Sequence, residues 1–229
     1  MSKLKKYIDT LFSEAQEHHY ARRFVEAKKI YAQILKVIPE NPDVLNSLGT
    51  ALAQSGNSKE AVGYLNRAIN LRPDLALFRV NLGVILQDLQ EFDRAKECYE
   101  HAINIDAGVG DAYYNLAKLY KQMGNLDAAL STYEHLLSLS PGRQDALINL
   151  GNIHFDNGAL DDAIACFQKA LLENSADKQL ADQANINLAN TYRRQGENVR
   201  AIEAYGHVLS REFRAGLRIK QAMTLPVVY

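Results

Sequence analysis

Six alanines recur along the chain at nearly constant spacing. They are Ala27, Ala61, Ala95, Ala129, Ala163 and Ala201. Four of the intervals are 34 residues long and the last is 38. A fixed period of this length is the signature of a stacked repeat protein, in which each unit buries its apolar face only against its neighbours. The sequence therefore predicts one continuous array of repeated units rather than a domain with a single central core.

Other residue types recur with the alanines. If the alanine is numbered as position 20, the repeats begin at Ile8, Pro42, Ala76, Gly110, Gln144 and Asp182. Position 8 is always Gly or Ala, and position 24 is always leucine or an aromatic residue. Glycine fills position 15 in four repeats, as Gly56, Gly124, Gly158 and Gly196.

These positions predict two packed helices in each repeat. Positions 4, 7, 8 and 11 form one stripe of a first helix. The small residues at positions 8 and 20 allow neighbouring helices to approach closely, and glycine at position 15 suits the left-handed residue that follows a helix. Asn41 followed by Pro42 predicts an N-cap and a proline in the first turn of a helix.

This pattern closely resembles the tetratricopeptide repeat (TPR) family, whose motif has a large residue, Leu, Gly and an aromatic residue in the first helix and Ala-rich positions in the second. The resemblance implies an all-α, right-handed α-solenoid superhelix of six TPR helix-turn-helix repeats with a C-terminal capping helix. We expect a single TPR array over residues 1–215 and a C-terminal helix or tail over residues 216–229.

Two stretches depart from the repeat pattern. Repeat one has Glu14 at an apolar position and Arg22 in place of the turn glycine, as expected where no further repeat stacks on the outer face. The four extra residues of the last interval fall within 171–181. We expect them to lengthen either the turn or the start of the next helix.

Charge and composition limit the kinds of partner. The net charge is −1, with mildly basic ends and a middle, residues 41–192, that carries eleven Lys and Arg against nineteen Asp and Glu. Such a middle suits ordinary solvated faces, or else partly basic ligands, and it does not favour nucleic acid. We find no apolar run long enough to span a membrane and no signal peptide, so we expect a cytoplasmic protein.

The chain has two cysteines, Cys98 and Cys166, which share position 23 two repeats apart. This separation is too large for a disulfide, so we expect small, partly buried thiols.

The candidate site comes from the opposite side of the first helices. Positions 2, 6, 9 and 13 lie roughly opposite the packed stripe, and the TPR resemblance implies that this side lines a concave groove. At position 6 the sequence places Asn81, Asn115, Asn149 and Asn187, and at position 9 it adds Lys118, Asn152 and Asn190. An amide side chain both donates and accepts hydrogen bonds, so a row of amides can bind the backbone of an extended peptide.

Two interpretations of these asparagines remain open. They could bind a ligand, which we favour because asparagine is a poor helix former and is nevertheless used four times in succession. They could equally brace adjacent helices. The ladder is similar to the one in the TPR region of O-linked N-acetylglucosamine transferases, where it holds substrate peptides. The sequence lacks the carboxylate clamp of chaperone-binding TPR domains.

We therefore expect a non-enzymatic protein-interaction scaffold that holds an extended peptide or a partner helix. No catalytic, cofactor-binding or metal-binding motif is present, so no cofactor and no metal are expected. One alternative is the substrate-recruiting TPR region of a Spindly-like protein glycosyltransferase, because the C-terminal segment is similar to the one that precedes the catalytic region in such enzymes. Another is a self-assembling scaffold, a homo-oligomer in which the acidic middle of one copy meets the basic end of another.

Overall fold

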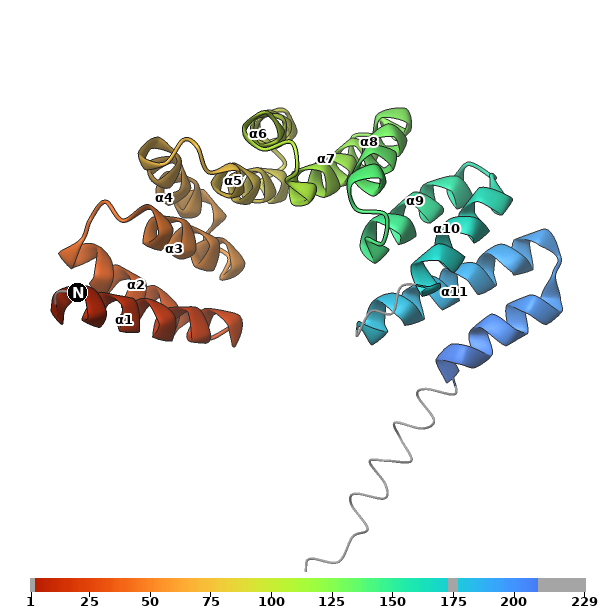
Figure 1. Cartoon of the computed structure of the whole chain (residues 1–229), viewed down its shortest axis with the longest axis horizontal. Helices are drawn as coiled ribbons and strands as arrows, with labels where there is room; N and C mark the ends of the chain where they lie inside the picture. Colours follow the sequence, from red (N-terminus) through yellow and green to blue (C-terminus); the bar gives the residue numbers. More distant parts are fainter. Residues whose placement is uncertain (1–2, 173–176, 210–229) are drawn as a thin grey trace, which may run out of the picture. The chain divides into compact units, whose positions relative to one another are not determined.

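The chain folds into α-helices, as its computed structural model shows for residues 3–172 and 177–209, with no strand among these residues. Figure 1 labels eleven of the helices. They are α1 (Lys3–Tyr20), α2 (Phe24–Val37), α3 (Pro42–Gln54), α4 (Ser58–Leu71), α5 (Ala76–Asp88), α6 (Phe92–Ile105), α7 (Gly110–Gln122), α8 (Leu126–Leu139), α9 (Gln144–Asp156), α10 (Leu160–Leu172) and α11 (Lys178–Gln195). Residues 198–209 are also helical. The all-α repeat fold predicted from the sequence is confirmed, while the expected C-terminal helix or tail, 216–229, lies outside the described residues.

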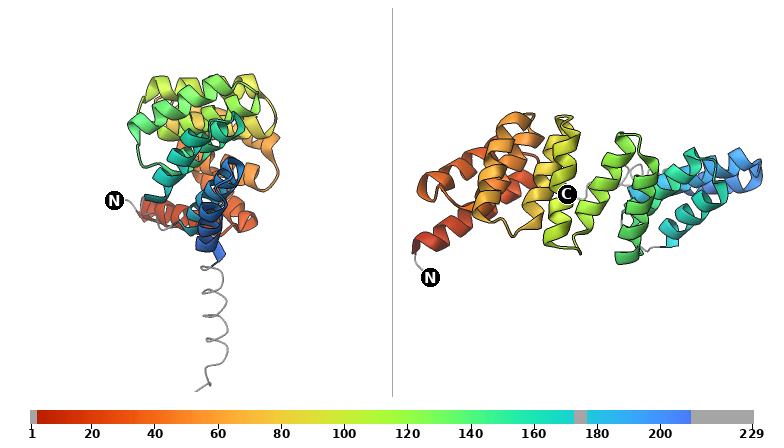
Figure 2. Two further views of the ribbon diagram at one scale, coloured as in Figure 1. Left: turned by 90° about the vertical axis from the view of Figure 1, so that its right-hand side faces the viewer. Right: turned by 90° about the horizontal axis from the view of Figure 1, so that it is seen from above.

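The helices pack mainly against their neighbours in the chain. Two compact units are formed, Met1–Thr132 and Tyr133–Tyr229. In the first unit α1 packs on α2, α3 on α4 and α5 on α6, and in the second α9 packs on α10 and α10 on α11. Figures 1 and 2 show these pairs side by side within each unit. First helices of successive repeats also touch, as α3 and α5 do in one unit and α9 and α11 in the other.

Small residues lie where the two helices of a repeat meet. The alanines at position 20 are fully buried in the first five repeats, and Ala201 is 4% exposed. A Cβ added at Gly151 would fall 2.6 Å from Cε1 of Phe167, the position 24 residue of the same repeat. Glycine or alanine at position 8 therefore makes room for the large side chain at position 24, as the sequence predicts.

The turns between helices use the predicted chemistry. The Asn41 side chain accepts a 3.1 Å hydrogen bond from the backbone N–H of Val44 and caps α3, with Pro42 in its first turn. The four glycines at position 15 all have φ between 79° and 90°. Arg22 and Gln90, at the same position in repeats one and three, also have positive φ, 58° and 63°. The turn geometry is therefore kept even where a side chain makes it unfavourable.

The four-residue insertion lengthens a helix. Helix α11 has 18 residues, whereas α9, the first helix of the preceding repeat, has 13. Its N-cap, Asp177, accepts hydrogen bonds from the backbone N–H groups of Gln179 and Leu180. The insertion thus extends the start of the first helix of repeat six, one of the two outcomes expected from the sequence.

Candidate functional site

The asparagines at position 6 lie on the first helices of repeats three to six. Asn81 on α5 and Asn115 on α7 belong to the first unit, whereas Asn149 on α9 and Asn187 on α11 belong to the second. All four are partly buried. Residues at position 13, such as Gln54 and Gln122, are exposed. The amides therefore lie deeper than the surrounding polar side chains and remain accessible to solvent.

In the first unit, one amide pair bridges two repeats. The Asn81 Nδ2 group of α5 donates a 2.9 Å hydrogen bond to Oδ1 of Asn46 on α3. The Asn115 amide instead donates to the backbone carbonyl of Asp111, one turn earlier in α7, at 2.8 Å. The unit thus has one amide that links helices and one that is bonded only within its own helix.

The second unit also has an amide pair that links two first helices. The Asn187 Nδ2 group of α11 donates a 2.8 Å hydrogen bond to Oδ1 of Asn152 on α9. Asn149 donates to the backbone carbonyl of Asp145 at 2.9 Å. The hydroxyl of Tyr205 donates to Oδ1 of Asn190 at 2.6 Å, so the position 9 amide of α11 is held by the following helix.

Lys118 is the one cation among the predicted site residues. Its side chain is exposed, and Nζ lies 5.5 Å from the ring centroid of Tyr114, one turn earlier on α7. A cation over an aromatic face at this distance is weakly attracted to it. Lys118 therefore places a positive charge beside the Asn115 amide.

A second row of hydrogen bonds braces the first helices near their C-terminal ends. The Nε2 atom of Gln87 at position 12 donates to Oε1 of Gln122 at position 13 of the next repeat, at 2.8 Å. His19 and Gln54 occupy the same two positions and lie 3.1 Å apart. The partners in this row are exposed or partly exposed, so the contribution of each hydrogen bond to stability is modest.

The two cysteines are half-buried free thiols, as predicted. Burial raises the pKa of Cys98, and burial raises the pKa of Cys166 to about 11 with a further contribution from Asp162. A protonated thiol is a poor nucleophile and a poor metal ligand. Among residues 3–172 and 177–209, no three His, Cys, Asp or Glu side chains gather closely enough to hold a metal ion.

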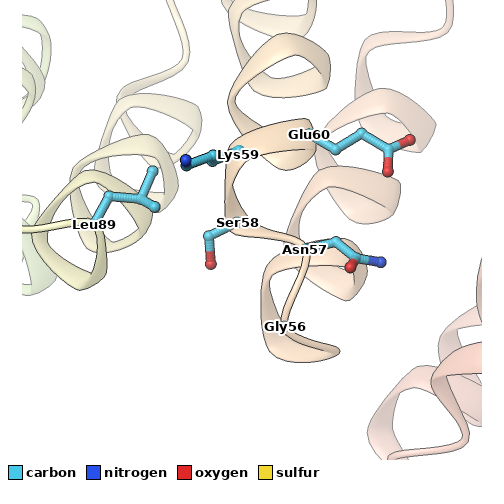
Figure 3. A pocket seen from close by; sticks show the side chains of 6 residues that line it. All are labelled: Gly56, Asn57, Ser58, Lys59, Glu60 and Leu89. Carbon is cyan, nitrogen blue, oxygen red and sulfur yellow. The ribbon is translucent and has the colours of Figure 1, made fainter.

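A shallow hollow beside the α3–α4 turn offers no converging groups. Figure 3 shows the side chains that line it, with Lys59 directed toward Leu89 and Glu60 directed to the other side of the helix. Asn57, the residue before α4, makes no capping hydrogen bond with its side chain. Since the polar groups diverge, this hollow has no geometry that would hold a small molecule.

Sequence reasoning missed several partners of the predicted site residues. Asn46, at position 5, is the acceptor for Asn81, and Tyr205, the aromatic residue at position 24 of repeat six, donates to Asn190. The only sequence signal for Asn46 is an asparagine 35 residues before Asn81, the same separation as between Asn152 and Asn187.

Family models agree with the repeat reading of the chain. Four models, each described as tetratricopeptide repeat, match residues 19–82, 74–141, 114–179 and 186–215. Together these matches extend over most of the 229 residues.

Curated relatives match over short stretches. Protein arginine N-methyltransferase 9 of Mus musculus is 37% identical over 65 residues, which are 28% of this chain and 8% of the relative. The co-chaperone sgt12 of the heat-shock protein cognate in Aspergillus fumigatus is 28% identical over 102 residues, 44% of this chain and 30% of the relative. The probable peptide N-acetylglucosaminyltransferase SPINDLY of Oryza sativa subsp. japonica is 37% identical over 59 residues, 26% of this chain and 6% of the relative. The chain thus spans less than a third of each of these proteins.

Solved structures match over more of the chain. MamA superposes with a TM-score of 0.61 at 28% identity, over 69% of this chain and 93% of MamA. The pilF protein of Pseudomonas aeruginosa gives a TM-score of 0.76 at 14% identity, over 96% of this chain and 97% of that protein. At 14% identity the second likeness shows the fold alone. None of the described helices of this chain combines the length and the apolar character that crossing a bilayer requires.

Proposed function

The chain belongs to the tetratricopeptide repeat family, and we propose that it is an interaction scaffold whose first helices hold an extended peptide through their asparagine side chains. The family's repeat fold is generally a non-catalytic scaffold for protein interactions. The proposed contacts are made in each unit separately, by the amides of α3, α5 and α7 in one and of α9 and α11 in the other. The peptide backbone, rather than particular side chains, is the group they bind.

Spare hydrogen-bonding capacity is the observation that carries this proposal. An asparagine amide has two N–H donors and an oxygen that accepts twice. In the Asn46–Asn81 pair one N–H and one acceptor site are used, and neither residue has a further side-chain partner within the described part of the chain. Three N–H groups and most of the acceptor capacity remain. A peptide backbone, with alternating N–H and C=O groups, is complementary to such a surface.

Bracing and binding are compatible in this arrangement. The hydrogen bond between Asn152 and Asn187 fixes both side chains before a ligand arrives. Fixing a flexible side chain on binding costs about 0.5–1.5 kcal/mol, so amides that are already fixed bind at a lower entropic cost. The two interpretations left open by the sequence therefore describe different hydrogen-bonding groups of the same side chains.

The test uses peptides, because the natural partner is not assumed. Random dodecapeptides displayed on phage are selected against the whole chain, and enriched sequences are synthesised with a fluorophore for anisotropy titrations. We expect the double variant Asn115→Ala, Asn149→Ala to weaken binding by tenfold or more, and its thermal unfolding is measured beside that of the unmodified chain to show that it remains folded. The matched control is Asn66→Ala, Asn104→Ala, which removes two exposed amides from the second helices α4 and α6. Equal affinities for all three proteins would contradict the proposal.

A second candidate function is recruitment of protein substrates within a larger transferase. The observation that favours it is that two of the relatives, the arginine methyltransferase and the SPINDLY protein, are transferases by name, and that the match covers only 8% and 6% of their lengths. In that case the bound peptides would include sites that are modified by the attached enzyme. Reading the gene beyond the codon for Tyr229 is the direct test: a catalytic region encoded there would support it, and a stop codon there would exclude a catalytic region on that side.

A further inference from the structure

A hollow in the second unit brings together two arginines, an amide and an aromatic ring. It has a volume of about 450 Å³ and is lined by Phe155 at the end of α9 and by Asn190, Arg193 and Arg194 on α11. Phe155 and Asn190 are partly buried, and both guanidinium groups are exposed. The two arginines and the asparagine supply mainly hydrogen-bond donors to this lining.

Arg194 is held in place by Phe155. Its Nη1 atom donates a 2.7 Å hydrogen bond to the backbone carbonyl of Phe155, and its guanidinium carbon lies 4.9 Å from the centroid of the Phe155 ring. A guanidinium has five N–H donors in a fixed planar fork. One is used for this hydrogen bond, so four remain on a group whose orientation is already fixed.

The Asn190 side chain is held by Tyr205. Its Oδ1 accepts the 2.6 Å hydrogen bond from the Tyr205 hydroxyl. This hydrogen bond uses one acceptor site of the amide oxygen, and the two N–H donors of Asn190 have no partner among the described residues. Because Asn190 lines the hollow, these two donors are available to a ligand bound there.

The neighbouring carboxylates of Asp156, Asp161 and Glu197 are not part of the lining of the hollow. Asp161 accepts a 2.7 Å hydrogen bond from Gln195, and Glu197 pairs with Arg200 at 2.7 Å. Asp156 is exposed and does not line the hollow. The side chain of Arg193 has neither a hydrogen-bond nor an ion-pair partner among the described residues. Among the residues that the structure describes, the lining of the hollow thus has two positive charges and no acidic side chain.

We propose that this hollow binds a carboxylate of the peptide that the scaffold holds, and so selects acidic peptides at the α9–α11 end of the second unit. The inference rests on the proposed function and adds a preference to it. Guanidinium groups bind carboxylates through two parallel hydrogen bonds, and Arg194 is already fixed for such a contact. The Phe155 ring supplies an apolar wall that excludes water from one side of the ion pair.

Stabilisation of α11 does not by itself account for the surroundings of Arg193 and Arg194. Basic residues in the last turn of a helix interact favourably with its dipole, and this alone would explain Arg193 and Arg194. It would not explain the ring that fixes Arg194 or the presence of the Asn190 amide, with two available N–H donors, in the lining of the same hollow. The two roles also predict different results for Arg193→Gln: a purely stabilising role predicts unchanged affinity for an acidic peptide, and a binding role predicts weaker affinity.

The experiment uses the same library of displayed dodecapeptides and the whole chain. An enriched peptide is synthesised in three forms: with its selected Asp or Glu and an amidated C-terminus, with Asn or Gln at that position, and with a free C-terminus. Each is titrated against the unmodified chain, Arg193→Gln, and the double variant Arg193→Gln, Arg194→Gln. Arg200→Gln is the matched control, since it removes an arginine of the same unit that pairs with Glu197 and lies outside the hollow.

We expect the library to enrich an acidic residue at one position of the peptide. Its amide replacement should lower affinity for the unmodified chain roughly tenfold, and the double variant should bind the acidic and amide forms equally. If only the peptide with a free C-terminus binds more tightly, the hollow binds a terminal carboxylate instead of an acidic side chain. If the amide form binds the unmodified chain as tightly, or if Arg200→Gln has the same effect as the double variant, the inference is overturned while peptide binding stands. A library that yields no binder would overturn the proposed function and this inference together.

Discussion

The ring of Tyr99 lies directly against the backbone of Gly83. A Cβ added at Gly83 would be 2.5 Å from Cε1 and 2.9 Å from Cδ1 of that ring. Tyr99 is fully buried, and its hydroxyl donates a 3.0 Å hydrogen bond to Oε1 of Gln87. The ring is therefore fixed at both its edge and its tip, which leaves it little freedom to move away from a larger residue at position 83.

This contact predicts opposite effects for two glycine-to-alanine changes in helices. Gly83→Ala should lower the free energy of unfolding by about 1–3 kcal/mol, the usual cost of overpacking a fixed contact. Gly63→Ala is the matched control, since nothing lies within 4 Å of a Cβ there on the exposed face of α4. It should raise stability by about 0.5–1 kcal/mol through helix propensity alone. Urea unfolding followed by circular dichroism measures both, and a stabilising Gly83→Ala would show that the ring moves freely.

The turn after α5 gives a second prediction. Gln90 has φ of 63°, a conformation that costs a residue with a Cβ about 1–2 kcal/mol. Gln90→Gly should therefore stabilise the chain, by about 1 kcal/mol after the greater freedom of glycine in the unfolded state is subtracted. The reciprocal change, Gly124→Gln in the turn after α7, where φ is 79°, should destabilise by a similar amount. Effects of the same sign in the two turns would refute this account.

The features that could be predicted from the sequence are those set within one repeat. The burial of Ala61, the fit of Gly151 against Phe167 and the Asn41 cap follow from periodicity and from local backbone geometry. The positive φ of Gln90 was not predicted, because the length of the turn imposes that conformation whatever residue occupies it.

The hydrogen bonds of the candidate site depend on the relation between repeats. Asn81 reaches Asn46 at position 5 of the preceding repeat, whereas Asn187 reaches Asn152 at position 9. Which of these partners is reached depends on the relative rotation and translation of successive first helices, and in repeat six also on the extended start of α11. The repeat period of the sequence does not specify this rotation and translation. The residues of the amide row could therefore be predicted, and their hydrogen-bond partners could not.

Burial of Cys166 predicts low thiol reactivity. Burial, with Asp162 adding to the effect, raises the pKa of this thiol from 9.0 to about 11, so little thiolate is present near neutral pH. Because the thiolate is the reactive form, alkylation by iodoacetamide at a mildly alkaline pH should be at least tenfold slower in the folded chain than in urea. The Cys98→Ser variant isolates the Cys166 signal in the mass spectrum.

The same raised pKa has a consequence for stability. The folded chain keeps the Cys166 proton while the unfolded chain releases it, so this group favours folding at low pH and its contribution is lost as pH rises from about 9 to about 11. The Cys166→Ser variant should lose stability less steeply over that interval. Parallel pH profiles for the two proteins, or equal alkylation rates in the folded and unfolded chain, would show that the thiol is not desolvated.

The hydrogen bond between Asn152 and Asn187 predicts a coupling between two side chains 35 residues apart. We expect Asn152→Ala, Asn187→Ala and the double variant to give a coupling free energy of about 1 kcal/mol in urea unfolding, the usual size for a partly buried hydrogen bond between neutral groups. The control cycle pairs Asn149 with Asn187, which share no hydrogen bond in the structure, and its coupling should be near zero. If the Asn152–Asn187 coupling is also near zero, the amides do not brace α9 against α11. Their proposed fixed orientation before ligand binding would then be wrong, because it depends on this bond.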